Sequence, residues 1–143
     1  MRLGNNAKID LLKRVPLFAG CSKKELEALA VIADEIDLRE GATLTREGQP
    51  GREFFVLVEG AVDVTQGGES ISRLGAGDWF GEIALLTKAS RTATVSAASP
   101  VRVLVVTDRA FRQVIETTPS IAVKMLERVG ERLAHDEASR SPG

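Results

Sequence analysis

The sequence predicts a mixed, mainly β fold, in which an antiparallel barrel or jelly roll carries helices at both ends. Between residues 34 and 106, short runs of alternating apolar and polar residues are separated by closely spaced glycines. Alternation is typical of strands with one buried face, and many short strands with glycine turns are typical of barrels and jelly rolls. On both sides of this region the apolar spacing changes to the three and four residues of a helix.

The chain has 143 residues, which suits one domain with its own hydrophobic core. We expect a single domain over residues 1–143. It would comprise N-terminal helices at about 7–33, the β region at about 34–106 and C-terminal helices at about 107–137.

Two helices are expected before the first strand. Ala7 to Arg14 has helical apolar spacing, and Pro16 ends that helix because proline cannot continue it. Ser22 and Glu25 have the spacing of a capping box, which predicts the start of a second helix.

The clearest strands are Phe54–Val58 and Val101–Val106, which are almost continuously apolar and rich in β-branched or aromatic residues. Gln66–Glu69, with two central glycines, predicts the tip of a hairpin. Further short strands are expected at 34–38, 43–45, 62–64, 71–74 and 92–96.

Two helices are expected at the C-terminal end. Thr107 or Asp108 would cap the first, and Pro119 marks the start of the second. Apolar residues of the last helix form one predicted stripe: Ile121, Met125, Leu126, Val129 and Leu133. Three readings of this stripe stay open: a face packed on the barrel, a lid over a ligand, or the seam of a homodimer.

The stretch from Phe80 to Val95 carries the chemistry. Gly81 opens a short helical turn, whose first amide N–H groups lack internal partners and attract anions. Arg91 can add a two-pronged hydrogen bond to the same anion, and Glu82 is suited to accept from a sugar hydroxyl. Taken singly, an Arg–Glu pair is more often a surface ion pair, and Gly81 a simple turn residue.

Two runs in this stretch, Phe80-Gly81-Glu82-Ile83-Ala84-Leu85 and Arg91-Thr92-Ala93-Thr94-Val95, resemble the phosphate-binding cassette of cyclic-nucleotide-binding domains. Such domains occur in catabolite activator proteins, in regulatory subunits of cyclic-nucleotide-dependent kinases and in gated channels. The resemblance runs from about Leu11 to Leu133. It implies an antiparallel β-roll, which is a jelly-roll-like double-stranded β-helix, with flanking N- and C-terminal helices.

The same resemblance implies the roles of individual residues. Arg91 binds the cyclic phosphate, Glu82 binds the ribose 2′-hydroxyl, and amides of the helical turn complete the shell. The expected binding set is Phe80, Gly81, Glu82, Ile83, Ala84, Arg91, Thr92 and Ala93. We expect cyclic AMP as the ligand in preference to cyclic GMP, although Thr92 is compatible with both.

The implied function is a cyclic-nucleotide sensor or regulatory module. The alternative is an interaction or dimerisation module of the same fold that binds no ligand. We expect no enzymatic activity, because no metal-ligand set or nucleophile–base pair is visible in the sequence. No catalytic residue and no cofactor is expected beyond the nucleotide ligand, and an effector domain in a longer protein is an expected partner.

Composition bounds the remaining possibilities. The formal net charge is −1, which offers no electrostatic basis for binding nucleic acid or an anionic membrane by this segment. Cys21 and His135 are the only residues of their types, so neither a disulfide framework nor a metal cluster is expected. Without an apolar run of membrane length, the sequence favours a cytoplasmic location.

Overall fold

The computed structural model describes residues 2–140, and the side chains of residues 2–136. Helices α1 (Asn5–Leu12) and α2 (Lys23–Ile32) flank a short 3₁₀ turn at Pro16–Phe18. The predicted capping box starts α2: Ser22 accepts from the Glu25 N–H, and the Glu25 carboxylate accepts from the Ser22 N–H at 2.7 Å. The first helix begins two residues before its expected start and ends two residues before its expected end.

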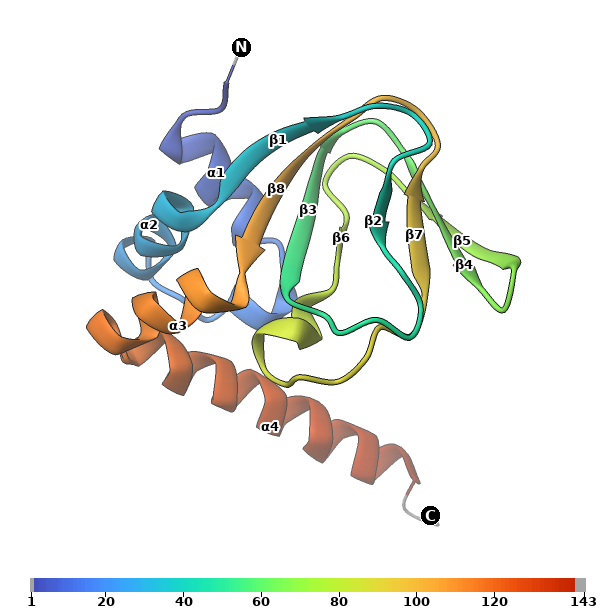
Figure 1. Ribbon diagram of the computed structural model, residues 1–143. Coiled ribbons are helices and arrows are strands. Elements are labelled where there is room, and N and C mark those ends of the chain that lie inside the picture. Colours follow the sequence, from blue (N-terminus) through green and yellow to red (C-terminus); the bar gives the residue numbers. More distant parts are fainter. Residues whose placement is uncertain (1, 141–143) are drawn as a thin grey trace.

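Eight strands form two antiparallel four-stranded sheets, arranged as a roll (Figure 1). The first sheet has the order β1-β8-β3-β6 and the second the order β2-β7-β4-β5. The strands are β1 (Asp34–Leu38), β2 (Thr43–Thr45), β3 (Glu53–Glu59), β4 (Val62–Gln66), β5 (Glu69–Leu74), β6 (Trp79–Phe80), β7 (Thr94–Ala97) and β8 (Val101–Thr107). The expected mainly β roll is therefore confirmed.

The turn between β4 and β5 shows how glycine sets the hairpins. Gly67 and Gly68 both have positive φ angles, of 59° and 82°. Positive φ at both central positions is what a two-residue hairpin turn with the twist of the flanking strands requires. The predicted tip at Gln66–Glu69 is therefore confirmed, and it fixes the pairing of Gln66 with Glu69.

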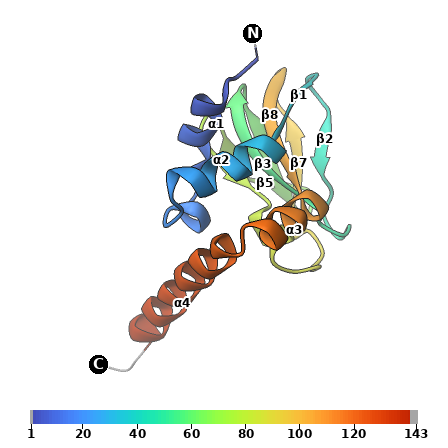
Figure 2. The same ribbon diagram turned by 90° about the vertical axis from the view of Figure 1, so that its left-hand side faces the viewer.

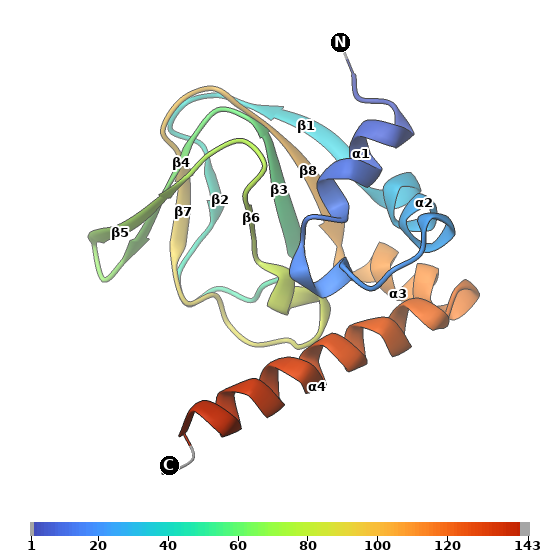
Figure 3. The ribbon, with the colours of Figure 1, turned by 180° about the vertical axis from the view of Figure 1, so that it is seen from behind.

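Two C-terminal helices complete the fold. Helix α3 (Asp108–Thr117) is capped by Thr107, whose hydroxyl accepts from the Ala110 N–H at 3.1 Å. Helix α4 (Ser120–Arg140) begins against the turn at Pro16–Phe18 and extends away from the body (Figures 2 and 3).

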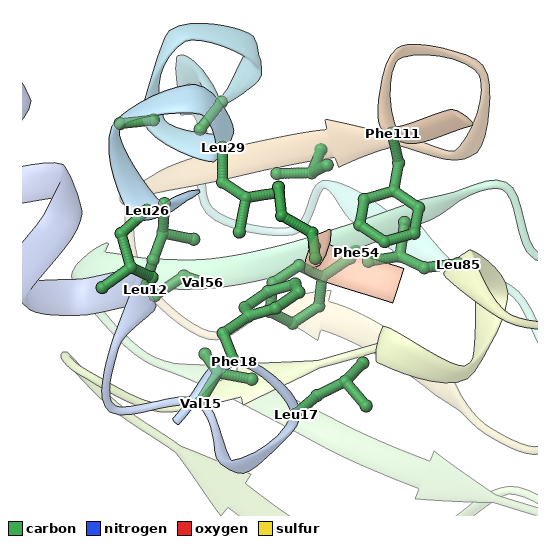
Figure 4. Packing of buried hydrophobic residues seen from close by; sticks show 14 of the residues in the cluster. Leu12, Val15, Leu17, Phe18, Leu26, Leu29, Phe54, Val56, Leu85 and Phe111 are labelled. Carbon is green, nitrogen blue, oxygen red and sulfur yellow. The ribbon is translucent and has the colours of Figure 1, made fainter. Parts of the chain in front are cut away.

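Alternate residues of β3 and β8 face two different cores, which explains why these strands are apolar throughout. Phe54 and Val56 face the helices, and the neighbouring residues Phe55 and Leu57 face the interior of the roll. The helix-side core joins both ends of the chain around Phe18 and includes Leu12, Val15, Leu17, Leu26, Leu29, Leu85 and Phe111 (Figure 4).

The predicted single stripe on α4 is wrong in part. Ile121 and Met125 are buried in the helix-side core, but Leu126 is 70% exposed and Leu133 is 59% exposed. Val129 also packs partly against the helix-side core, whereas Leu126, next to the buried Met125, lies on a face of α4 that no other described element covers. Leu133 lies farther toward the C-terminal end of α4, which extends away from the body (Figure 2).

Candidate functional site

The expected binding residues line one cavity of about 490 Å³ at the end of the roll. Among the residues on its wall are Phe80, Gly81, Glu82, Ile83, Ala84, Arg91, Thr92 and Ala93. Two separate segments, one on each side of a loop, are therefore brought to the same hollow.

Gly81 makes the turn between strand β6 and the short helix that follows it. Its φ of +83° lies in the left-handed region that favours glycine, and a 3₁₀ helix, η2, then runs from Glu82 to Leu85. Phe80 anchors the preceding strand because its ring stacks on Phe55 with a centroid separation of 4.9 Å.

The first amides of η2 differ in their availability. The Ala84 N–H already donates to the Gly81 carbonyl at 3.1 Å. Within residues 2–140, the N–H groups of Glu82 and Ile83 have no acceptor. Two adjacent main-chain donors at the start of this turn are thus free to bind an anion.

Arg91 lies in a slot between two glycines. A Cβ atom built on Gly51 would come within 3.0 Å of its Nε, and one built on Gly81 within 2.6 Å of its Nη1. The Nη2 group donates to the main-chain carbonyl of Glu53 at 2.6 Å. The slot therefore holds one edge of the guanidinium by a hydrogen bond. Glycines stand at the two positions where a larger side chain would collide with Arg91.

The main chain around Arg91 is fixed from the loop before β3. The Arg91 N–H donates to the Gln49 carbonyl at 2.8 Å, and the Gly48 N–H donates to the Arg91 carbonyl at 2.9 Å. Strand β7 begins after this segment, at Thr94 instead of at the expected Thr92.

Burial lowers the pKa of the Arg91 guanidinium from its ordinary value, and the nearby charge of Glu53 acts in the opposite direction. An arginine remains a cation at neutral pH despite such a shift. A half-buried cation has lost part of its hydration, so it gains more than an exposed one from contact with an anion.

Glu82 contributes an acceptor to the same cavity. It is half-buried on the first turn of η2, and its carboxylate makes no ion pair with Arg91 or with any other described residue. A carboxylate in this position repels a phosphate but can accept hydrogen bonds from hydroxyl groups.

The far walls of the cavity come from residues that were not predicted from the sequence. Val64 on β4, Leu74 on β5, Trp79 on β6 and Val95 on β7 supply apolar surface, and Thr45 closes the floor with its hydroxyl already donating to the Ala93 carbonyl. Trp79 packs partly against the helix-side core and also borders the cavity. The order of the strands in the two sheets decides which strands lie beside the cassette. The alternating residue pattern of these strands does not indicate that order.

Helix α4 takes no part in this cavity, since none of its described side chains lines it. Within the described residues, there is no group of three His, Cys, Asp or Glu side chains that could hold a metal ion. The described helices also include none with the length and apolar character needed to cross a membrane.

The cavity places a cation beside two free amides, and comparison with known proteins identifies the class of this domain. The family model of the cyclic nucleotide-binding domain matches residues 35–118. This chain therefore belongs to the cyclic nucleotide-binding domain family, as its cassette indicated.

Individual relatives agree with this assignment. The chain is 39% identical over 140 residues to a cAMP-dependent protein kinase regulatory subunit of Mycosarcoma maydis, a match that covers 90% of this chain and 25% of the relative. It is 33% identical over 115 residues to a cGMP-dependent protein kinase of Eimeria tenella, covering 80% of this chain and 12% of the relative. The chain thus spans a quarter or less of the length of these two relatives.

A solved structure confirms the fold. The N-terminal domain of a transcriptional regulator from Streptomyces coelicolor A3(2) superimposes with a TM-score of 0.85 at 29% sequence identity. The match covers 94% of this chain and 99% of that domain, so the flanking helices are included with the roll.

Proposed function

We propose that this chain is a non-enzymatic sensor that binds cyclic AMP in the cavity beside η2. The cyclic phosphate meets Arg91 and the free N–H groups of Glu82 and Ile83, and the ribose 2′-hydroxyl donates to the Glu82 carboxylate. The observation that carries the proposal is the slot that holds Arg91, with its Nη2 fixed on the Glu53 carbonyl at 2.6 Å.

The remaining walls suit a purine. Val64, Leu74, Trp79 and Val95 offer apolar surface, against which a flat base can pack. Thr92 is exposed at the rim and accommodates either base. The preference for cyclic AMP rests on the kinase regulatory subunit among the relatives, with cyclic GMP as the alternative ligand.

Ligand binding is proposed to change the position of the C-terminal helix. Ile83 and Leu86 beside the cavity are 51% and 47% exposed, and Leu126 on α4 is 70% exposed. If phosphate draws η2 inward, these apolar groups gain burial as α4 closes. A tenfold preference of the nucleotide for the closed state would contribute about 1.4 kcal/mol.

The setting proposed for this domain is a cytoplasmic protein in which it controls an effector. Both relatives are several times longer than the segment that matches this chain, so the rest of each chain has room for an effector domain. Neither nucleic acid nor a membrane is proposed as a ligand of the domain itself.

A direct titration tests the proposal. Trp79 is the only tryptophan and borders the cavity, so its fluorescence reports on occupancy without interference from other tryptophans. Cyclic AMP, cyclic GMP and the open-ring 5′-AMP should be titrated in parallel. Saturable binding of cyclic AMP, tighter than both competitors, supports the proposal. Binding of 5′-AMP with equal affinity would contradict a site shaped for the cyclic phosphate.

The second candidate is an interaction module, favoured by the exposed apolar groups of α4. Val123, Leu126 and Leu133 are each more than half exposed. A dimer formed through this helix without any response to either cyclic nucleotide would support this candidate over the first. Sedimentation velocity with and without the nucleotides separates the two.

A further inference from the structure

A second cavity, of about 830 Å³, lies on the outer side of the segment that holds Arg91. It is bounded by the start of β3, the loop after η2 and the first turns of α3, three segments that meet at one end of the roll (Figure 1). Each of the three contributes positive charge to its wall. We call the four residues concerned the basic face: Arg52, Lys88, Arg109 and Arg112.

The cations of the basic face have no partners of their own. Within the described part of the chain, none of the four makes an ion pair or a side-chain hydrogen bond. Other arginines of this protein do: Arg73 pairs with Asp63 at 2.9 Å, and Arg128 with Glu131 at 3.3 Å. Since acidic and basic residues are nearly balanced in number, 20 against 19, four unpaired cations around one hollow are a local concentration of charge.

Three carboxylates also line this cavity: Glu53, Asp108 and Glu116. Asp108 accepts from the main-chain N–H of Arg109 at 2.7 Å, at the start of α3. The charge of Glu53 acts on Arg91, on the other side of the segment. Glu116 is the third carboxylate on the wall, so the cavity carries four cations against three acids, and Arg91 partly offsets the charge of one of these acids, Glu53.

We propose that the basic face docks an acidic segment of a partner protein. Arginine forks bind carboxylates in pairs, and three arginines from two segments can meet several carboxylates of one peptide. A peptide can space its carboxylates so that they avoid Asp108 and Glu116, whereas the phosphates of a nucleic-acid backbone are evenly spaced and cannot.

The position of this surface couples it to the nucleotide site, a step that rests on the proposed function. Gly51 and Glu53 line the outer cavity and also hold Arg91 from the other side. The carbonyl of Arg52 accepts from the N–H of Asp108 at 2.8 Å, and the next carbonyl, of Glu53, accepts from Arg91. A partner that shifts Arg52 and the start of α3 therefore shifts the support of Arg91, and by linkage the nucleotide changes the partner's affinity equally.

The test uses a fluorescein-labelled peptide of ten glutamates and measures its anisotropy with the full chain. Arg109→Glu/Arg112→Glu reverses two charges of the basic face. Arg39→Glu/Arg46→Glu is the matched control, because both arginines are exposed, unpaired among the described residues and outside the cavity. Both double variants have the same net charge, so nonspecific attraction falls equally in the two.

We expect the peptide to bind in a salt-dependent way, the first variant to weaken it at least about tenfold, and the control to weaken it less than about threefold. Equal losses in both variants, or no binding of the peptide at low salt, would overturn the proposal. A ten-residue oligothymidylate that binds more tightly than the peptide and responds to the same variant would reassign the face to nucleic acid.

Adding cyclic AMP separates this proposal from the previous one. A change of about threefold or more in peptide affinity at saturating nucleotide supports the coupling. If Trp79 fluorescence shows that no nucleotide binds, yet the peptide still distinguishes the two variants, the docking surface stands and the nucleotide proposal fails. If nucleotide binds and peptide affinity is unchanged, the coupling is wrong.

Discussion

The guanidinium of Arg91 donates to the main-chain carbonyl of Glu53 at 2.6 Å, across 38 positions of sequence. This contact fixes one edge of a half-buried cation. Because the guanidinium is planar and rigid, this contact also fixes the direction of its other N–H donors. These donors are therefore suited to a two-pronged contact with a phosphate.

Replacing Arg91 tests the proposed phosphate contact. Arg91→Ala should weaken cyclic AMP binding by about 2–5 kcal/mol, since the phosphate would lose its charged partner in a partly desolvated site. Isothermal titration calorimetry measures the loss. Arg46→Ala, an exposed arginine outside the cavity, is the control and should bind normally. Unchanged affinity in Arg91→Ala would rule out the assignment.

Replacing Glu82 tests the proposed ribose contact. Glu82→Ala should lose about 1–3 kcal/mol toward cyclic AMP, as a hydrogen bond to a charged group disappears. The 2′-deoxy analogue should bind wild type and variant alike, because it lacks the hydroxyl that Glu82 accepts from. A variant that still prefers the ribose form shows that another residue reads the hydroxyl.

The two glycines of the slot give a prediction about positioning. Gly81→Ala and Gly51→Ala should each weaken cyclic AMP roughly tenfold, because a methyl group at either site displaces the Arg91 side chain. Calorimetry with folded protein measures the loss.

Gly41→Ala is the matched control for backbone strain. Gly41 has a φ of +88°, close to the +83° of Gly81, but an added Cβ there meets nothing within 4 Å. Gly41→Ala should lose about 1–2 kcal/mol of stability, and Gly81→Ala at least as much, because its added Cβ also comes within 2.9 Å of the Glu53 carbonyl oxygen. Only Gly81→Ala should lose affinity. Equal loss of affinity in the two would mean that general strain, and not contact with Arg91, explains the effect.

A buried carboxylate at the base of α4 gives a prediction about pH. The hydroxyl of Ser120, then the main-chain N–H of Ser22, lower the pKa of Glu25 from 4.5 to about 2. Its Oε1 also lies 3.4 Å from the Lys124 Nζ. Because the folded pKa is the lower one, this group stabilises the fold fully above pH 4.5, and the contribution is lost as pH falls toward 2.

Urea unfolding measures that contribution. Glu25→Gln should be less stable than wild type by about 1–3 kcal/mol at pH 6, and the difference should shrink steadily between pH 4.5 and pH 2. A difference that stays constant over this range would show that the carboxylate charge is not the stabilising feature.

Local patterns in the sequence alone predicted much of the fold. The Ser22–Glu25 capping box, the glycine hairpin before Glu69 and the continuous apolar run of β3 each depend on neighbours within a few residues. The cassette is local too, since Gly81, Glu82 and Arg91 lie within eleven positions of one another. Residue type and spacing therefore predicted both the turn that offers amides and the cation that faces them.

Contacts between distant segments were decided by the tertiary structure. Gly51 and Glu53 hold Arg91 only because the loop before β3 folds against the loop before β7, and nothing in their local sequence marks that meeting. The apolar spacing of α4 predicted a stripe, but the tertiary structure decides which of its members are covered: Met125 is buried, whereas the adjacent Leu126 lies on the uncovered face and is exposed. A sequence specifies which face of a helix is apolar. Burial of that face requires a neighbouring element, and the packing of the whole domain decides which distant parts of the chain become neighbours.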